Sequence, residues 1–324
     1  MLTLDRVTKV YKVGAFGGTN LTAVRNVSFD VQSGEVVSLI GESGSGKSTI
    51  GKMILKLVKL NGGSIVFDGQ DVSTLSGSAS KTYYKSVQGV FQDPFSSYNP
   101  IFKADRVFRL IRDEYFPDVA HREWQAKIES ALEAVSIDPS AVLGKYPHQL
   151  SGGQLQRLLI ARALLLDIRF LVADEIISML DASTRIDVLN LLGDLRARGL
   201  GILFITHDLS LGYYSSQRTV ILSRGAIVEM GLTEKVYGNP LHPYTRSLIA
   251  SVPHLHKTWS EVAREVGSHE AGADICLYHE AYPDQKPEIA DDGPALALVE
   301  EDHFVGCAKR NVDGSCGARS TSTG

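Results

Sequence analysis

Apolar residues at strand spacing dominate the beginning of the chain. Residues 2–13 and 23–31 alternate between apolar and polar positions, which predicts two half-buried strands. Residues 36–40 form an unbroken apolar run, which predicts a buried strand. From Thr49 to Val58 the apolar residues recur at helical spacing, so a helix is expected soon after that strand. This part of the chain is therefore rich in strands, which we expect to be mainly antiparallel around one parallel strand.

The middle of the chain is predicted to be mainly helical. It follows a hairpin-type turn at 61–63 and a short strand at 64–67, and it starts with a polar-faced helix at 71–87. A further short strand at 89–92 stops at Asp93-Pro94, because proline cannot donate to a strand ladder. Helical segments then follow at 104–116, 121–135 and 138–143. We expect a helical insertion between strands here.

Helices and strands alternate over the rest of the patterned region. The helices are predicted at 151–166, 183–198, 233–237 and 244–250, and the strands at 170–175, 201–206, 220–222 and 226–229. Such alternation is typical of an α/β fold. After Val252 the pattern weakens, and the last residues, 311–324, are predicted to be a disordered tail.

Composition places the chain among ordinary globular proteins. Of 324 residues 44% are hydrophobic and 22% are charged, and the net charge of −4 gives no bulk attraction to nucleic acid. No apolar run approaches the roughly 18 residues that could span a bilayer, and the N-terminus reads as a strand, not a signal peptide. The three cysteines all follow residue 270 and make no disulfide framework, which favours the cytoplasm.

A glycine-rich segment joins the strand at 36–40 to the helix near Thr49. Its sequence, Gly41-Glu42-Ser43-Gly44-Ser45-Gly46-Lys47-Ser48, fits the G-x-x-x-x-G-K-[ST] phosphate-binding loop. Glycines let the backbone turn tightly and bring N–H groups close to phosphate oxygens, and the start of the next helix attracts the same anion. A chance Gly/Ser turn is the alternative, which the strand before and the helix after disfavour. The predicted nucleotide-binding residues are Gly41, Ser43, Gly44, Ser45, Gly46, Lys47, Ser48 and Thr49, with Lys47 at the β- and γ-phosphates and Ser48 on Mg²⁺.

Two carboxylates follow the apolar run at 170–173. Asp174 and Glu175 lie at the C-terminal end of a predicted strand, where α/β sheets bind ligands. Asp174 is expected to hold Mg²⁺ through water, and Glu175 to polarise an attacking water as general base. Two solvated carboxylates at a strand end remain the alternative for this motif alone.

A glycine pair opens the helix at 151–166. Leu150-Ser151-Gly152-Gly153-Gln154, followed by Leu-Gln-Arg, strongly resembles the signature sequence of ABC (ATP-binding cassette) ATPases. A helix capped by Ser151 would explain the serine but not two glycines in the first turn, where glycine is costly. The resemblance implies that two subunits pair head-to-tail. The signature residues that would then contact the partner's ATP are Ser151, Gly152, Gly153 and Gln154.

The resemblance covers residues 1–250 almost without a gap. It implies one P-loop ATPase domain over 1–250, with an antiparallel β subdomain and a helical subdomain at about 93–151, and a small irregular extension over 251–324. By the same resemblance, Tyr11 stacks on adenine, Gln92 touches Mg²⁺ and water, and His207 contacts the γ-phosphate. Residues 178–181 match the D-loop and place Asp181 at the dimer. The catalytic set is therefore Glu175, His207, Lys47 and Gln92, and the metal set is Ser48, Gln92 and Asp174.

Two positions depart from the family pattern. Ile176 follows the catalytic Glu where the family usually has proline, which alters the turn but removes no catalytic group. Leu155 stands where a polar residue is common. All residues that handle charge are present, so we expect a site that hydrolyses ATP.

A narrower resemblance concerns 91–100 and 239–245. These segments look like those of the oligopeptide/dipeptide/nickel importer ATPases, and residues 178–183 look closer to an oligosaccharide-importing branch. The resemblance implies two transmembrane permease subunits, a second ATPase subunit (related or identical) and, indirectly, an extracytoplasmic solute-binding protein. It places the chain peripherally at the cytoplasmic face of the membrane. Tyr98 and its neighbours near Gln92 are the candidates for contact with a permease.

The C-terminal segment of that group often binds a four-iron cluster. Cys276 and Cys307 match its last two cysteines, His269 stands about where an earlier one is expected, and Cys316 lies in the tail. Because such clusters need soft thiolates, and two are missing, we expect no iron–sulfur cluster.

The sequence therefore predicts an ATPase that uses ATP and Mg²⁺ to drive uptake of oligopeptides or oligosaccharides. One alternative is a soluble ABC ATPase of DNA repair or translation, although those typically carry two cassettes or a long coiled coil. The others are a nucleotide switch that does not hydrolyse ATP and an iron–sulfur sensor. The transported solute cannot be read from this chain.

Overall fold

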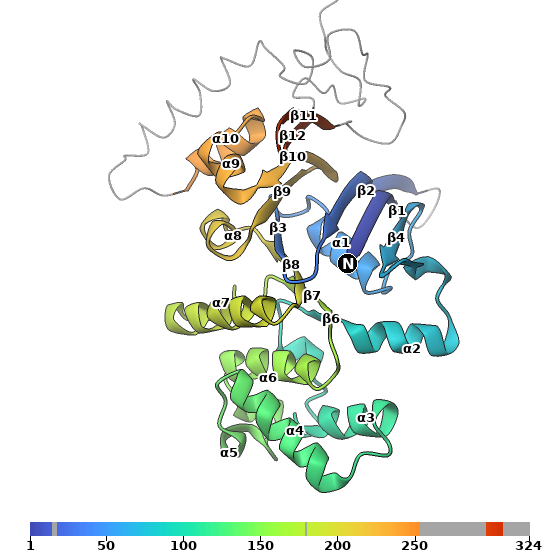
Figure 1. The fold of residues 1–324 in the computed structure, drawn as a ribbon, viewed down its shortest axis with the longest axis vertical. Helices are drawn as coiled ribbons and strands as arrows, with labels where there is room; N and C mark the ends of the chain where they lie inside the picture. Colours follow the sequence, from blue (N-terminus) through green and yellow to red (C-terminus); the bar gives the residue numbers. More distant parts are fainter. Residues whose placement is uncertain (15–17, 179, 253–295, 307–324) are drawn as a thin grey trace, which may run out of the picture. The chain divides into compact units, whose positions relative to one another are not determined.

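The computed structural model describes residues 1–14, 18–178, 180–252 and 296–306. It divides into two compact units. The helical unit comprises Met1, Val31–Val36 and Thr74–Ile205, and the strand-rich unit comprises Leu2–Asp30, Val37–Ser73 and the residues from Thr206 on. Figure 1 shows the elements of both.

The first sheet of the strand-rich unit has the order β2-β1-β4-β5. Its members are β1 (Leu2–Val13), β2 (Thr19–Val31), β4 (Gly62–Phe67) and β5 (Gln70–Asp71). Leu2, Leu4 and Val7 are buried, which accounts for the alternating pattern of β1, since one face packs against a core.

The predicted hairpin turn at 61–63 is wrong. Gly62 and Gly63 lie inside β4, opposite an irregularity in the pairing with β1 between Asp5 and Thr8. Gly63 has a φ of +75°, and a Cβ there would lie 2.3 Å from the carbonyl oxygen of Arg6. Gly63 is therefore needed for a β-bulge and not for a turn.

The second sheet of this unit contains β3 (Val36–Ile40), β9 (Arg218–Ser223) and β10 (Ala226–Leu232). β3 and β9 are parallel, and β10 pairs antiparallel with β9. Every residue of β3 is buried, as expected for a parallel strand covered on both faces. The helices of the unit are α1 (Lys47–Ile54), α8 (Leu209–Ser215), α9 (Thr233–Gly238) and α10 (Pro243–Ala250).

A C-terminal hairpin extends this second sheet. β11 (Leu296–Glu300) and β12 (His303–Gly306) pair antiparallel, and β12 pairs with β10 (Figure 1). The apolar pattern does not predict this hairpin, although Ala297 and Val305 are buried in it.

The helical unit is built on three parallel strands in the order β6-β7-β8. They are β6 (Val87–Val90), β7 (Phe170–Asp174) and β8 (Gly201–Thr206). Its helices are α2 (Gly77–Ser86), α3 (Arg106–Tyr115), α4 (His121–Ala134), α5 (Pro139–Val142), α6 (Gly152–Leu164) and α7 (Ala182–Ala197). Short 3₁₀ turns lie at Val72–Thr74, Phe95–Ser97 and Pro147–Gln149.

The inserted helices bury apolar side chains. Phe108 of α3, Trp124 and Leu132 of α4 and Leu155 of α6 are all buried, and α4 packs against α6. Leu155 is fully buried, so its apolar character is explained by packing.

The predicted elements agree with the structure to within a few residues except at two further places. The helix predicted at 71–87 begins only at Gly77, because Asp71 accepts hydrogen bonds from Ser73 and closes a turn first. The strand predicted at 89–92 spans Val87–Val90 and ends before Gln92. Among the described residues, no helix is both long enough and apolar enough to span a membrane.

Candidate active site

The phosphate-binding loop Gly41–Ser48 connects β3 to α1 in the strand-rich unit. Gly44 and Gly46 have φ values of +80° and +105°, a region that residues with a Cβ rarely adopt. A Cβ on Gly41 would lie 2.1 Å from the carbonyl oxygen of Leu222, and one on Gly46 would lie 2.4 Å from that of Ala23. Since Gly46 is also the N-cap of α1 and carries no capping side chain, the first N–H groups of the helix can take an anion.

Lys47 is held inside this loop. Its side chain is only 5% exposed, and its ammonium donates to the carbonyl oxygens of Gly41 at 2.7 Å and Glu42 at 2.8 Å. The buried positive charge lies at the start of α1, where the helix dipole adds to it. A phosphate is the natural counter-ion for such an arrangement. The next residue, Ser48, is exposed, and Thr49 is half-buried.

Tyr11 and His207 belong to the same unit. Tyr11 is half-buried on β1, and the ammonium of Lys9 lies 5.0 Å from the centroid of its ring. His207 is exposed and follows β8. The next residue, Asp208, caps α8 by accepting from the N–H groups of Ser210 at 2.9 Å and Leu211 at 3.3 Å, which fixes the backbone just after His207.

The paired carboxylates lie in the helical unit. Asp174 is the last residue of β7 and is buried, whereas Glu175 is half-buried in a turn. Glu175 has a φ of +50°, and its carbonyl accepts from the N–H of Ser178 at 3.1 Å and from its hydroxyl at 2.9 Å. A left-handed residue of this kind costs about 1–2 kcal/mol, and strain of this sort is common at active sites. Ile176 is buried beneath the turn, so an apolar residue serves where the family usually has proline.

The signature residues start α6 in the same unit. Ser151 and Gln154 form a capping box: the Ser151 hydroxyl accepts from the Gln154 N–H at 3.2 Å, and the Gln154 side chain accepts from the Ser151 N–H at 2.9 Å. A Cβ on Gly153 would lie 3.3 Å from the methyl of Thr184, whereas one on Gly152 would meet nothing closer than 3.9 Å. Packing within the chain thus accounts for one glycine of the pair but not for Gly152.

Gln92 is exposed just after β6, and α6 holds the backbone that leads to it. The side chain of Gln156 donates to the carbonyl of Phe91 at 3.4 Å, and Arg162 donates to that of Gly89 at 3.1 Å. Sequence reasoning gave neither residue a role, because nothing in a helix pattern shows which strand its polar side chains reach.

Asp181 is committed to capping α7. Its carboxylate accepts from the hydroxyl of Ser183 at 2.6 Å and from the N–H of Thr184 at 3.0 Å. These bonds hold the pKa of Asp181 well below its ordinary value. Met179 of the predicted D-loop lies outside the described residues, as do His269, Cys276, Cys307 and Cys316. The expectation about an iron–sulfur cluster therefore stays a prediction.

Two family models match the chain. The model described as "ABC transporter" matches residues 24–178, and the one described as "Oligopeptide/dipeptide transporter, C-terminal region" matches residues 228–288. A protein of Brucella ovis named for peptide import and ATP binding is 39% identical over 318 residues, which are 96% of this chain and 98% of that protein. The chain belongs to the ABC transporter ATP-binding family.

Other relatives agree with this assignment. The oligopeptide transport ATP-binding protein AppF of Bacillus subtilis is 39% identical and spans 89% of each chain, and OppF of Streptococcus mutans is 43% identical over 79% of this chain and 86% of its own. The dimeric ATP-binding cassette MJ0796, solved with ADP and Pi, matches 72% of this chain and 99% of its own with a TM-score of 0.65 and 28% identity. This ABC protein is therefore an ATPase, with the P-loop α/β fold that the sequence predicted.

Proposed function

We propose that this ABC ATPase drives the import of peptides through partner membrane subunits. The observation that carries the proposal is the presence of both family models in one chain, together with relatives named for peptide transport. Those names favour peptides over the oligosaccharides that residues 178–183 suggested. They also disfavour the alternative of a soluble repair or translation ATPase.

The proposed reaction is in-line attack of water on the γ-phosphate of ATP. Lys47 and the N–H groups at the start of α1 bind the phosphates and stabilise the developing charge, while Tyr11 stacks on adenine. Glu175 orients and deprotonates the water, and His207 holds the γ-phosphate. The Ser151 and Gly152 end of α6 contacts ATP held by a second ATPase subunit, which gives the unexplained Gly152 a function.

Magnesium fits the oxygen ligands that the chain offers. The described residues include no cluster of three or more His, Cys, Asp or Glu that could cage a metal. Mg²⁺ is commonly held by one or two protein oxygens, water and substrate phosphates, so a cage is not needed. Ser48, Gln92 and the buried carboxylate of Asp174 would supply the protein ligands. The ion would neutralise charge on the phosphates.

A surface near Gln92 suits a permease partner. Phe95, Ile101 and Phe102 are exposed. Ile101 and Phe102 also line a pocket of about 500 Å³, together with Lys103, Asp105, Arg106, Arg109 and Tyr146. The hydroxyl of Tyr98 is buried, so its exposed neighbours, not Tyr98 itself, would make the contact. We place the ATPase at the cytoplasmic face of the membrane with two permease subunits and, indirectly, an extracytoplasmic binding protein.

Uptake of a labelled tripeptide by cells that lack this chain tests the proposal. The wild-type gene should restore uptake, and Lys47→Ala should not, because the ammonium that binds phosphate is gone. Lys52→Ala is the matched control: it lies on the same helix but is exposed, and it should restore uptake. Restored uptake with Lys47→Ala, or no restoration by the wild type, would exclude the proposed role.

A further inference from the structure

Tyr244 makes a polar contact with the phosphate-binding loop. The N–H of Glu42 donates to the hydroxyl oxygen of Tyr244 at 3.1 Å. That N–H belongs to the same peptide group as the carbonyl of Gly41, which accepts from the Lys47 ammonium at 2.7 Å. Because a peptide group is planar, fixing its N–H also fixes the direction of its C=O. The planar peptide group between Gly41 and Glu42 therefore links the Tyr244 hydroxyl to the Lys47 ammonium.

The ring of Tyr244 is fixed by packing. It packs, with Leu248 and Ile249 of the same helix, against a buried cluster that contains Ile40, the residue just before Gly41. Burial raises the pKa of this phenol, so the hydroxyl stays neutral and keeps both its O–H and its acceptor lone pairs. The ring of Tyr244 thus packs near Ile40, and its hydroxyl binds the N–H of Glu42, so both ends of the backbone from Ile40 to Glu42 are in contact with this residue.

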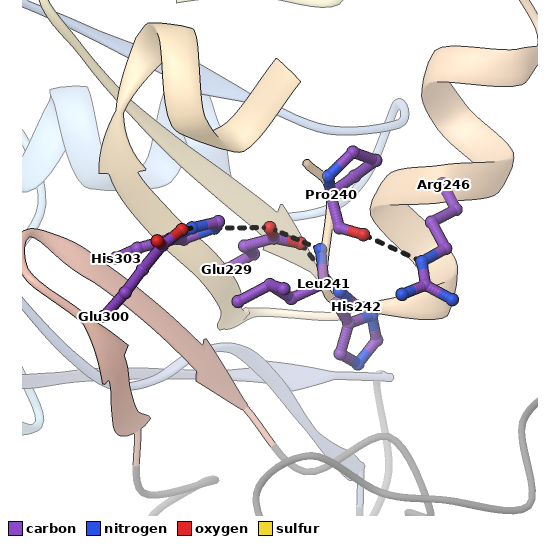
Figure 2. A network of polar contacts seen from close by, with 7 residues as sticks. All are labelled: Glu229, Pro240, Leu241, His242, Arg246, Glu300 and His303. Carbon is purple, nitrogen blue, oxygen red and sulfur yellow. Dashed lines mark hydrogen bonds and ion pairs between the residues drawn. The ribbon is translucent and has the colours of Figure 1, made fainter. Parts of the chain in front are cut away.

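The start of α10 is itself anchored by Glu229 of β10 (Figure 2). The carboxylate of Glu229 accepts from the N–H of Leu241 at 2.8 Å and from that of His242 at 2.9 Å. Both groups come immediately before α10, and His242 caps the helix through its Nδ1. Arg246 adds a bond from its side chain to the carbonyl of Pro240 at 2.8 Å.

His303 of the C-terminal hairpin completes this network. Its Nε2 lies 2.8 Å from Glu229, its Nδ1 lies 2.9 Å from Glu300, and neither Glu229 nor His303 is exposed. Both ring nitrogens face carboxylate oxygens, which are acceptors, so the protonated ring, which donates from both nitrogens, fits this site. A buried carboxylate is costly unless it is paired, and His303 supplies the charge that balances Glu229.

We propose that Tyr244 is a positioning residue for the phosphate-binding loop, and that the Glu229–His303 pair acts on the loop through α10. The C-terminal hairpin thereby helps to set the affinity for MgATP. This inference rests on the proposed binding of phosphate by Lys47. It gives a function to the His242-Pro243-Tyr244 segment, for which sequence reasoning offered only a family resemblance.

Tyr244→Phe in the full chain tests the inference, because it removes the hydroxyl and keeps the ring. Losing one hydrogen bond that orients the loop should raise the Kd for MgATP about three- to tenfold. At saturating ATP the kcat should stay within about twofold, since no reacting group is lost. Tyr237→Phe is the matched control: its ring packs on the same cluster, but its hydroxyl donates to the carbonyl of Leu209 and not to the loop. It should leave the Kd unchanged.

His303→Gln tests the other end of the network. It should also raise the Kd, and adding it to Tyr244→Phe should raise the Kd by less than the product of the two single effects, because both act through one helix. Equal Kd values of the wild type and Tyr244→Phe for MgATP would overturn the inference. This holds even if Tyr244→Phe is less stable than the wild type in the absence of nucleotide. If Tyr244→Phe does not fold, an unchanged Kd of His303→Gln for MgATP is enough to reject the inference. A wild-type chain that binds no MgATP would instead remove the proposed function.

Discussion

Single residues of the phosphate-binding loop have different reasons for being glycine. Gly46 combines a φ of +105° with a backbone carbonyl 2.4 Å from where its Cβ would stand, whereas Gly44 has a φ of +80° and no atom within 4 Å. The sequence motif treats both as equivalent. The structure separates a purely conformational requirement from one that also involves close packing.

A matched pair of substitutions makes this difference measurable. Gly44→Ala should lower the free energy of unfolding without nucleotide by about 1–2 kcal/mol, which is the cost of a left-handed residue with a Cβ. Gly46→Ala should cost clearly more, because the backbone must also move away from Ala23. Denaturant unfolding of the two variants checks this. Equal losses would contradict the packing argument.

Most residues of the candidate site could be proposed from the sequence because their motifs are local. The loop at 41–48 and the signature at 150–154 each depend on a few consecutive residues, so the printed sequence is enough to find them. The side-chain partner of the Glu42 N–H could not be predicted in this way. Tyr244 is distant from Glu42 in the sequence and meets it only because α10 packs on the cluster around Ile40.

At the scale of elements, strongly periodic segments were predicted well and the C-terminal hairpin was missed. β3, β7 and β8 are buried along their whole length, and continuous apolar runs reveal such strands. β11 and β12 are short, with three exposed residues in β11, and the turn between them is Glu301-Asp302 instead of a glycine-containing pair. Asp302 takes the left-handed conformation at a φ of +54°, which sequence rules assign to Asp only weakly.

The attachment of this hairpin should depend on pH. Burial lowers the pKa of His303, but the hydrogen bonds that its ring donates to Glu229 and Glu300 outweigh this effect and raise the pKa above the ordinary 6.5. Glu229 also accepts from the N–H of His242 at the start of α10, and Lys235 of α9 lowers the pKa of Glu300; Glu301 and Asp302 precede His303 in the chain. A raised pKa means that the folded chain holds the proton more tightly than the unfolded chain does. The resulting stability is complete below about pH 6.5 and is lost as the pH rises through the raised pKa.

Comparing the Tm of the wild type with that of His303→Gln over a pH series checks this prediction. The Tm of the wild type should exceed that of the variant most at about pH 6, and this Tm difference should shrink as the pH is raised towards about 9. Glutamine cannot titrate, so the pH dependence of the gap isolates the imidazole from other groups. A gap that grows with pH, or that does not change, would contradict a charged His303 in the folded chain.

At the scale of the whole molecule, identity to relatives and site chemistry point to the same activity. The Brucella ovis relative is matched over 96% of the chain, and the cassette MJ0796 was solved as a dimer with ADP and Pi. The general fold class followed from alternating strands and helices. The transported solute could not be inferred from the sequence pattern, because no residue of this chain is expected to touch it.

We propose that Glu175 is the general base for ATP hydrolysis by this chain. Measurements of MgATP binding and turnover by the purified chain test this role by comparing Glu175→Gln with the exposed control Glu133→Gln. We expect Glu175→Gln to bind MgATP as the wild type does, to accumulate as a dimer and to lose turnover by about 100-fold or more, while the control keeps its turnover. Unchanged turnover in Glu175→Gln would exclude Glu175 as the base.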